Sequence, residues 1–463
     1  MYTLSSFVTQ LGSFLVLPLF WQKLSPSDYG IMAVTEIIGS ILGIIFGLQL
    51  DTYVSRYYYE WPERERKRKV GAAWVASLIS SVVLGCASCF FLSIFSHLLF
   101  NGLRFYPFIF FGLVNAILKS FMNVPYATIR IKQLPLLYSI FSVASFALQM
   151  SLNIYFVLIL NLQLEGYFIA NIIGSSLTVV VLGAIMLRFA TPCIRGGGLR
   201  ESMKFSLPII PSGLVGTICS VGDRFILQHF ASLETLGIYA ISLKFSGLIV
   251  SFHMALKLSY IPFMVESLSK NLEKGIRDLA RMSVFYVLPL MMLGLVISAY
   301  MKDFVLFTNR PDYLPVIQWI PWLIWAAILQ TVNVYFTPGL FLSKRTDLMW
   351  IPATIQMVAM LSAGFLLIPH YQMEGAVITR YCSAISFFAI SLVMTKKYYP
   401  IPVNWTKVLL LTVIMVSGTI VLSMVEFNNL AFSIVSKALF IAFLGSICLA
   451  IIMVFPRSAK YSV

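Results

Sequence analysis

The sequence predicts an all-α integral membrane protein with about 14 transmembrane helices, two six-helix lobes plus two extra helices, and both termini in the cytoplasm. Composition is the first reason, because 59% of the 463 residues are hydrophobic and only 11% are charged. Such a composition lies outside the range of soluble domains. The second reason is that the apolar residues fall into separate long stretches. The third is an uneven distribution of Lys and Arg between the loops.

The apolar stretches have the length that a helix needs to cross a hydrocarbon core roughly 30 Å thick. No water is available there to satisfy the backbone, and the alternation typical of a β-barrel is absent, so we expect helices. The first stretch lacks the basic start and the cleavage site of a signal peptide, and we expect it to remain as the first helix. The predicted spans are 3–22, 31–53, 71–95, 105–126, 136–158, 166–188, 204–222, 236–261, 282–300, 313–336, 347–368, 374–395, 407–425 and 432–455.

Basic residues concentrate on every second loop. Of the 33 Lys and Arg, 23 fall on even-numbered loops and the C-terminal tail, six on odd-numbered loops, and four inside apolar stretches. Short loops rich in Lys and Arg are retained in the cytoplasm, which places both chain ends there. The net charge of +15 is therefore a signal of topology, and it requires no nucleic-acid partner.

A glycine-rich segment divides the chain. We interpret residues 191–203 as a cytoplasmic linker between an N-terminal lobe, 1–190, and a C-terminal lobe, 204–400, with two extra helices in 401–463.

The two lobes also carry a similar turn. Leu24-Ser-Pro-Ser-Asp-Tyr-Gly30 follows the first span, and Ala231-Ser-Leu-Glu-Thr-Leu-Gly237 follows the seventh, 207 residues later. Because the offset crosses six spans, an even number, both lobes have the same orientation. A parallel repeat about an axis along the membrane normal is typical of transporters in which one half rocks against the other.

Two carboxylates are candidates for binding a coupling ion, H+ or Na+. Glu36 lies several residues inside the second span, where a carboxylate normally faces a wet cavity or a charged partner. Asp51 follows on the same helix face. The glycines of the same face, in Gly39-xxx-Gly43-xxx-Gly47, favour instead a close contact between two helices.

Four basic residues lie inside apolar stretches, where topology does not explain them. Lys257 is near a cytoplasmic end and can extend its charge to the interface. The other three, Lys119, Lys244 and Arg380, suit an anion that crosses the membrane, such as a phosphate or pyrophosphate. The alternative is a buried ion pair that locks helices together, for example Arg380 with Glu36.

Two arginines at interfacial depth, Arg56 and Arg224, complete the predicted substrate site as lateral gates, or else they anchor the helices at lipid headgroups.

No metal site is predicted, because Cys86-x-x-Cys89 lies inside an apolar stretch and the four histidines lack ligand spacing. The longest external loop, near 301–312, leaves little room for an extramembrane catalytic site, which argues against an enzyme.

Several motifs together resemble the polysaccharide flippase family. This family covers O-antigen, capsule and exopolysaccharide flippases within the multidrug/oligosaccharidyl-lipid/polysaccharide exporter superfamily, which also holds MATE drug exporters and lipid II flippases. The resemblance spans nearly the whole chain, although Ala359-Met-Leu-Ser-Ala363 stands where the family often carries asparagines. The motifs are Leu17-Pro-Leu-Phe20 with Lys23-Leu-Ser-Pro-Ser-Asp-Tyr-Gly30, Phe205-Ser-Leu-Pro-Ile-Ile-Pro-Ser212 with Asp223-Arg-Phe-Ile-Leu227 and Gly237-Ile-Tyr239, and Gly339-Leu-Phe-Leu-Ser-Lys-Arg-Thr346 with Ile368-Pro369, Glu374-Gly-Ala376 and Lys397-Tyr-Tyr-Pro400.

The resemblance implies a transporter of the bacterial cytoplasmic membrane that flips undecaprenyl-diphosphate-linked oligosaccharides by alternating access. It implies no cofactor, and its partners are the lipid-linked substrate, membrane lipids and polysaccharide assembly proteins. Arg380, Lys244 and Lys119 are the expected diphosphate contacts. The alternative is a cation-coupled, MATE-like exporter of small molecules, which a cavity dominated by carboxylates and aromatic side chains would favour.

Overall fold

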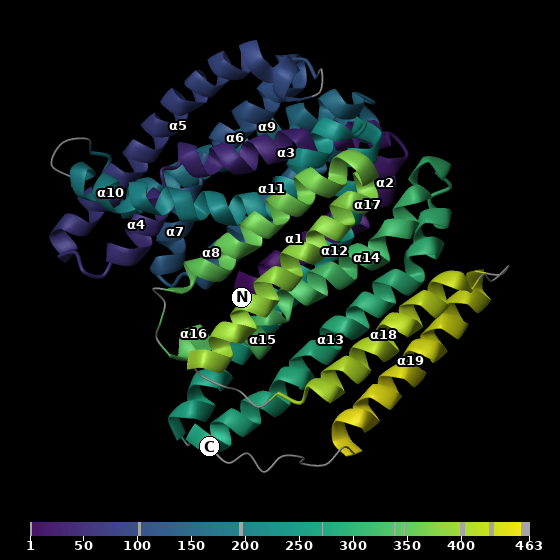
Figure 1. Ribbon diagram of the computed structural model, residues 1–463. Coiled ribbons are helices and arrows are strands. Elements are labelled where there is room, and N and C mark those ends of the chain that lie inside the picture. The colour runs from purple at the N-terminus through teal and green to yellow at the C-terminus, as the bar shows by residue number, and fades with distance from the viewer. Residues whose placement is uncertain are drawn as a thin grey trace. The chain divides into compact units, whose positions relative to one another are not determined.

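In the computed structural model, all regular secondary structure in the described residues is helical (Figure 1). The described residues are 2–100, 103–193, 198–270, 272–337, 339–343, 345, 348–398, 403–425 and 430–454. Twelve helices in this part of the chain are long and apolar enough to cross a membrane. The predicted class, an all-α multi-span membrane protein, is confirmed. The cytoplasmic placement of both termini stays a prediction.

The first half of the chain begins with two short helices in place of the first predicted span. Residues 194–197 of the predicted linker lie outside the described residues. The elements are α1 (Tyr2–Leu15), α2 (Leu17–Trp21), α3 (Pro26–Phe46), α4 (Leu50–Tyr57), α5 (Glu63–Leu99), η1 (Phe105–Ile109), α6 (Phe110–Phe121), α7 (Asn123–Ile131), α8 (Pro135–Asn153), η2 (Ile154–Ile159), α9 (Gln163–Phe189), α10 (Leu199–Ser206), η3 (Leu207–Ile209) and α11 (Ile210–Phe230).

The second half contains the longest helix, α17, which is two helices joined at Gln372, where φ is 42° and ψ is −110°. This break separates the two spans predicted at 347–368 and 374–395. The elements are α12 (Leu233–Lys270), α13 (Leu272–Phe307), η4 (Pro311–Tyr313), α14 (Pro315–Thr331), α15 (Asn333–Phe336), α16 (Gly339–Leu342), α17 (Trp350–Tyr398), α18 (Trp405–Met424) and α19 (Leu430–Val454).

The chain forms two compact units. The first comprises Met1–Ala240 and Met357–Thr379, and the second comprises Ile241–Gln356 and Arg380–Val463. The helices α12 and α17 contribute to both. The lobe boundaries expected from the sequence stay a prediction, and each unit is described by itself below.

In the first unit, α3 packs against α5, α6 and α11. The helix begins at a capping box: Ser25 Oγ accepts a hydrogen bond from the backbone N–H of Asp28, and the Asp28 carboxylate accepts one from the backbone N–H of Ser25 at 2.8 Å. Pro26 at the first helical position fixes φ for the first turn. Against α6, a Cβ on Gly112 would come within 2.8 Å of Thr35. These features fix both the start and the position of α3.

The two turns that the sequence relates as a repeat contact each other reciprocally. A Cβ on Gly30 would lie 2.0 Å from the carbonyl oxygen of Leu233, and a Cβ on Gly237 would lie 1.8 Å from that of Pro26. Backbone therefore meets backbone at the starts of α3 and α12, which only glycine allows. The two turns compared in the sequence are therefore in direct contact, while the parallel repeat of the two lobes stays a prediction.

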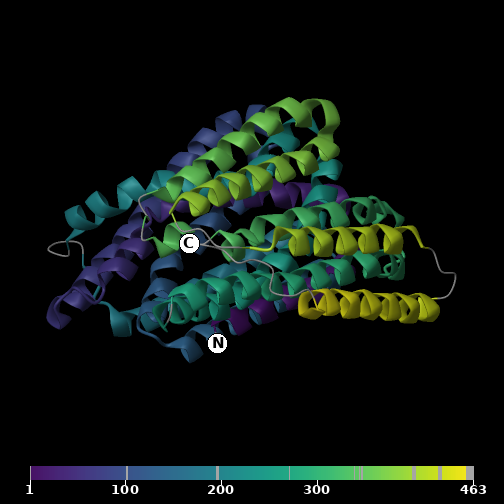
Figure 2. The same cartoon turned by 60° about the horizontal axis from the view of Figure 1, so that its bottom comes forward.

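In the second unit, α13 packs against α14, α18 and α19 (Figure 1). The two last helices appear in yellow in Figure 2. A buried ion pair joins α19 to α13: Lys437 Nζ lies 2.5 Å from Asp303 Oδ2, with side chains 3% and 16% exposed. Ser433 Oγ donates to the other carboxylate oxygen at 3.0 Å. Lys437 is one of the six basic residues assigned to odd-numbered loops, and that assignment is wrong, because Lys437 lies inside α19.

We expect Lys437→Met to destabilise the purified protein by about 3 kcal/mol or more, because it leaves the Asp303 carboxylate buried without its counter-charge. Adding Asp303→Leu should recover most of the loss. Thermal unfolding in detergent measures both. Lys270→Met is the control, since its pair with Glu266 is exposed and contributes little. A double variant as unstable as the single one would contradict the ion-pair explanation.

Candidate functional site

An ion pair between α3 and α11 lies within two predicted membrane spans. Arg224 Nη1 is 3.5 Å from Glu36 Oε2, and the Glu36 side chain is 61% exposed whereas that of Arg224 is 12% exposed. A carboxylate with this exposure at such a depth is expected to face a water-filled cavity, because exposure to hydrocarbon is costly. The pair therefore marks the wet side of α3.

The hydrogen-bonding capacity of Arg224 is only partly used. Its Nη2 reaches the carbonyl oxygen of Ser220 at 3.5 Å, a long contact. Its Nε is buried and has no partner among the described residues. A guanidinium has five N–H donors in a planar fork, so Arg224 retains donors for an oxyanion.

Asp223, next to Arg224, has a structural role. It is 2% exposed, and its carboxylate accepts hydrogen bonds from the backbone N–H of Arg224 at 2.8 Å and from the hydroxyl of Tyr239 at 2.5 Å. These bonds fix the Arg224 backbone and join α11 to the first turns of α12. Asp223 precedes Arg224 in a motif that the sequence already marks, Asp223-Arg-Phe-Ile-Leu227.

The helices α9 and α6 carry further polar side chains, and one of them, Tyr167, interacts with Glu36. On α9, Tyr167 is close enough to Glu36 for the two groups to interact electrostatically. Two turns further along α9, Ser175 donates a hydrogen bond to the side-chain oxygen of Asn115 on α6 at 2.8 Å. Lys119 lies one turn after Asn115 on α6 and is exposed. Neutral polar side chains spaced four residues apart on α9, Tyr167, Asn171 and Ser175, are a signal in the sequence that charges alone do not give.

The glycines of α3 leave space where the sequence suggested a close helix contact. A Cβ on Gly43 of α3, or on Gly216 of α11, would meet no atom within 4 Å, and one on Gly39 would make an ordinary contact with Ala116 at 3.5 Å. The glycine stripe is therefore not a tight seam along its length. It leaves open space one to two turns from Glu36.

Two of the three other predicted residues of the first unit, Asp51 and Arg56, lie away from this ion pair. Asp51 and Arg56 lie on α4, beyond the end of α3, and Glu36 is about 15 Å of helix before that end. Arg56 is exposed and pairs with Glu60. Asp51 is half-buried in the first turn of α4 and interacts electrostatically with Arg130.

An aromatic cluster holds α4 in place. Tyr53 is fully buried, and its ring lies 5.4 Å from that of Trp61 and 5.9 Å from that of Phe205. Burial and the neighbouring Glu201 carboxylate raise the pKa of Tyr53. Glu201 of α10 also pairs with Lys69 of α5 at 3.3 Å. The last residues of the predicted linker, which form the start of α10, are thus attached to α4 and α5.

The other two predicted cations belong to the second unit. Lys244 lies on α12 and is exposed, and Arg380 lies on α17 and is half-buried. Both are within helices long and apolar enough to span a membrane. The ion pair that the structure shows for Glu36 is formed with Arg224, a residue of its own unit.

The family of chains described as "Polysaccharide biosynthesis protein" matches residues 23–310 of this sequence. This chain belongs to that family. The match includes Glu36, Lys119, Arg224 and Lys244, and it ends before Arg380.

Two proteins of Haemophilus influenzae are similar in sequence. The lsg locus protein 1 is 22% identical over 281 residues, which cover 58% of this chain and 66% of that protein, just under two thirds of its length. An uncharacterized membrane protein is 22% identical over 353 residues, covering 74% of this chain and 83% of that protein.

The fold is similar to those of two solved transporter types. The lipid II flippase MurJ in an inward closed conformation has a TM-score of 0.73 at 15% identity, covering 97% of this chain and 98% of that one. A variant of the Vibrio cholerae MATE transporter VcmN has a TM-score of 0.59 at 14% identity, covering 85% and 94%. The protein is therefore a multi-pass membrane protein whose fold is similar to those of these two transporters.

The half-buried Asp51 predicts a pH dependence of stability. Burial raises the pKa of Asp51 above its ordinary value of 3.8. The folded protein then holds this proton more tightly than the unfolded chain, so the contribution of Asp51 favours folding at low pH and is lost as pH rises through the raised pKa. We expect Asp51→Asn to be stabilised relative to the parent protein as pH rises from about 4 to 7.

Thermal unfolding in detergent across that pH range measures this effect. Glu63→Gln, at the exposed start of α5, is the control. A constant difference between Asp51→Asn and the parent protein at all pH values would contradict the assignment.

Proposed function

We propose that this protein is a flippase that moves undecaprenyl-diphosphate-linked oligosaccharides across the bacterial cytoplasmic membrane by alternating access. It would act in surface polysaccharide assembly, as a transporter and without catalysing a covalent reaction. Family membership supports the substrate class. The observation that carries the proposal is the Glu36–Arg224 pair, which places an arginine with unused donors on the wet side of a membrane span.

In the proposed cycle, the diphosphate competes with Glu36 for Arg224. Arginine binds phosphate oxygens through two parallel N–H donors, which a single long contact with a carboxylate does not satisfy. Lys119, one turn from Asn115 on α6, adds a second positive charge in the same unit. We propose Lys244 and Arg380 as diphosphate contacts contributed by the second unit.

The same competition gives Glu36 a role in coupling. Once the diphosphate engages Arg224, Glu36 loses its counter-charge in a membrane environment, where an isolated carboxylate is costly. Binding of H+ or Na+ to Glu36 offsets that cost, so substrate and ion load together. Asp51 remains a second candidate for binding the coupling ion. Arg56 remains a candidate for contacting lipid headgroups at the membrane interface.

A cation-coupled exporter of small molecules is the alternative, and the exposed carboxylate of Glu36 near Tyr167 favours it. The two functions differ in what a deletion strain loses. Loss of surface glycan supports the flippase, whereas sensitivity to toxic small molecules with normal glycan supports the exporter.

We expect Arg224→Gln to reduce glycan export, because removing a charge-assisted pair of hydrogen bonds costs roughly tenfold or more in affinity for a diphosphate. Arg380→Ala and Lys244→Ala should also reduce export. The measurement is surface glycan in a deletion strain complemented at equal protein level. Arg277→Gln, an exposed arginine of α13 outside the proposed site, is the matched arginine control and should export close to normal amounts. Full export by Arg224→Gln would exclude this residue from the substrate site.

The reciprocal glycine contact supports alternating access, because one end of the pathway opens only if the starts of α3 and α12 separate. We expect Gly30→Leu to prevent these turns from closing and to lower export at least tenfold, since its Cβ would lie 2.0 Å from a backbone oxygen. Gly43→Ala is the matched control, as its Cβ meets nothing within 4 Å. Glycan export and the yield of folded protein are measured together. Equal export by the two variants would show that the contact between the starts of α3 and α12 has no part in the transport cycle.

A further inference from the structure

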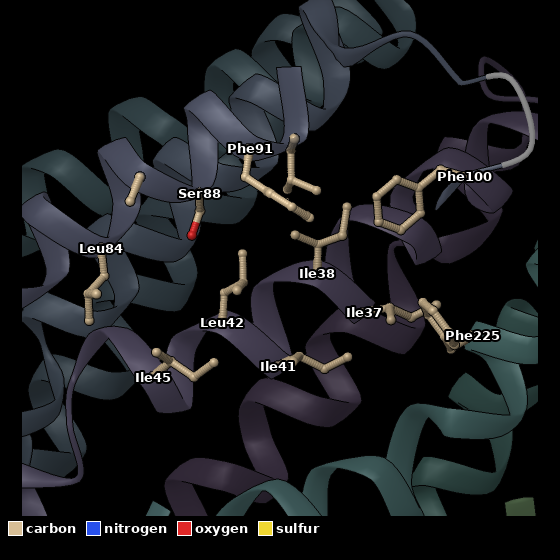
Figure 3. A pocket seen from close by; sticks show the side chains of 12 residues that line it. Ile37, Ile38, Ile41, Leu42, Ile45, Leu84, Ser88, Phe91, Phe100 and Phe225 are labelled. Atoms are coloured by element: carbon tan, nitrogen blue, oxygen red, sulfur yellow. The ribbon is translucent and has the colours of Figure 1, made fainter. Parts of the chain in front are cut away.

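An apolar pocket lies on the other side of α3 from the wet face. Its volume is about 370 Å³, more than twice that of an engineered apolar cavity of roughly 150 Å³ that holds benzene. Figure 3 shows side chains of α3 and α5 pointing into the same space, with Phe100 at one end. The α3 wall runs from Ile37 to Ile45, a length of about 12 Å along the helix.

The helix α5 is fixed to its neighbours on both sides of this pocket. Toward one end, Ser80 Oγ donates a hydrogen bond to the carbonyl oxygen of Phe46, the last residue of α3, at 2.7 Å. At the other end, Gln228 Nε2 of α11 donates to the carbonyl oxygen of Leu99, the last residue of α5, at 2.8 Å. Because both ends are held, α5 cannot simply collapse onto α3, and the space between them must be filled by something else.

Water is a poor occupant for this space. An ordered buried water needs two to four polar partners, and Ser88 is the one polar residue in the lining, which is otherwise Ile, Leu, Phe and Ala. The pocket also lies within two helices long and apolar enough to span a membrane. Its surrounding solvent is therefore lipid hydrocarbon, and a hydrocarbon chain would restore the dispersion contacts that an empty pocket forfeits.

Charge at the Phe100 end indicates what the chain is attached to. The two ionisable residues in the segment 97–104 are His97 and Arg104, and both are exposed. Arg104 can hold a phosphate at the membrane interface while the attached chain extends past Phe100 into the pocket. A phospholipid supplies both parts, and phospholipids greatly outnumber any carrier lipid in a bilayer, so mass action favours them.

We propose that this pocket is a binding site for one phospholipid acyl chain, with the lipid phosphate at Arg104. The bound chain acts as a wedge between α3 and α5. Its walls include Ile37 and Phe225, which directly follow Glu36 and Arg224, the two members of the ion pair. A chain in the pocket thus supports the α3–α11 seam from its apolar side, whatever substrate the protein carries.

The test compares retained lipid in pocket and surface variants. Ser88→Phe places a ring in the pocket, whereas Cys86→Phe places the same ring on an exposed position two residues away on α5. The proteins are washed in delipidating detergent and examined by native mass spectrometry. We expect one phospholipid on the parent protein and on Cys86→Phe, and about tenfold less on Ser88→Phe, because losing the burial of roughly two methylenes already gives that factor.

Two further variants complete the test: a second pocket variant, and one that removes the proposed contact of Arg104 with the lipid phosphate. Leu42→Phe fills the pocket from the α3 wall and should lose lipid in the same way. It therefore provides the test in case Ser88→Phe does not fold. Arg104→Gln should lower retention of the same lipid while leaving the pocket intact. The proposal is overturned by a parent protein without bound lipid, by equal retention in the pocket variants and Cys86→Phe, or by full retention in Arg104→Gln. Recovery of a polyprenyl lipid in place of a phospholipid would also overturn it.

Discussion

The close contact between two glycine-bearing turns is the constraint on which the first unit depends. Gly30 and Gly237 bring the backbones at the starts of α3 and α12 to a separation that no side chain could occupy. A contact of this kind fixes position more sharply than side-chain packing, because backbone atoms have no rotamers with which to adapt. The capping box at Ser25 and Asp28 then sets the first turn of α3. Everything that α3 carries is positioned from this point.

The helix α3 separates two environments. One face presents the exposed carboxylate of Glu36 and the open space beside Gly43, and the other presents isoleucines to an apolar pocket. A helix between lipid and water needs such asymmetry, since a charge on the lipid side would be too costly. Arg224 meets α3 at the boundary between the two faces. The electrostatics of the site and the hydrophobic packing behind it therefore share one element.

Much of the fold could be predicted from the sequence, because the length of each apolar stretch is a property of the chain itself. Pairing between distant residues could not. A pair of Arg380 with Glu36 was one of two open alternatives and stays a prediction. The pair that the structure shows for Glu36 uses Arg224, which lies inside a helix because α11 extends eight residues beyond the predicted span. The glycine spacing on α3 correctly marked a special face, but the same spacing suits a tight seam and an open groove. Only the neighbouring helices distinguish them.

The ion pair between Lys437 and Asp303 gives the polypeptide an order of assembly. A lysine near the start of an apolar helix weakens the tendency of that helix to enter the bilayer alone. Its counter-charge is on α13, 134 residues earlier in the chain, so α13 is already synthesised when α19 emerges. The helix α19 can therefore insert next to α13, where Lys437 pairs with Asp303, and need not enter lipid with its lysine unpaired. Biogenesis, and not transport alone, explains why a membrane helix would keep a buried lysine.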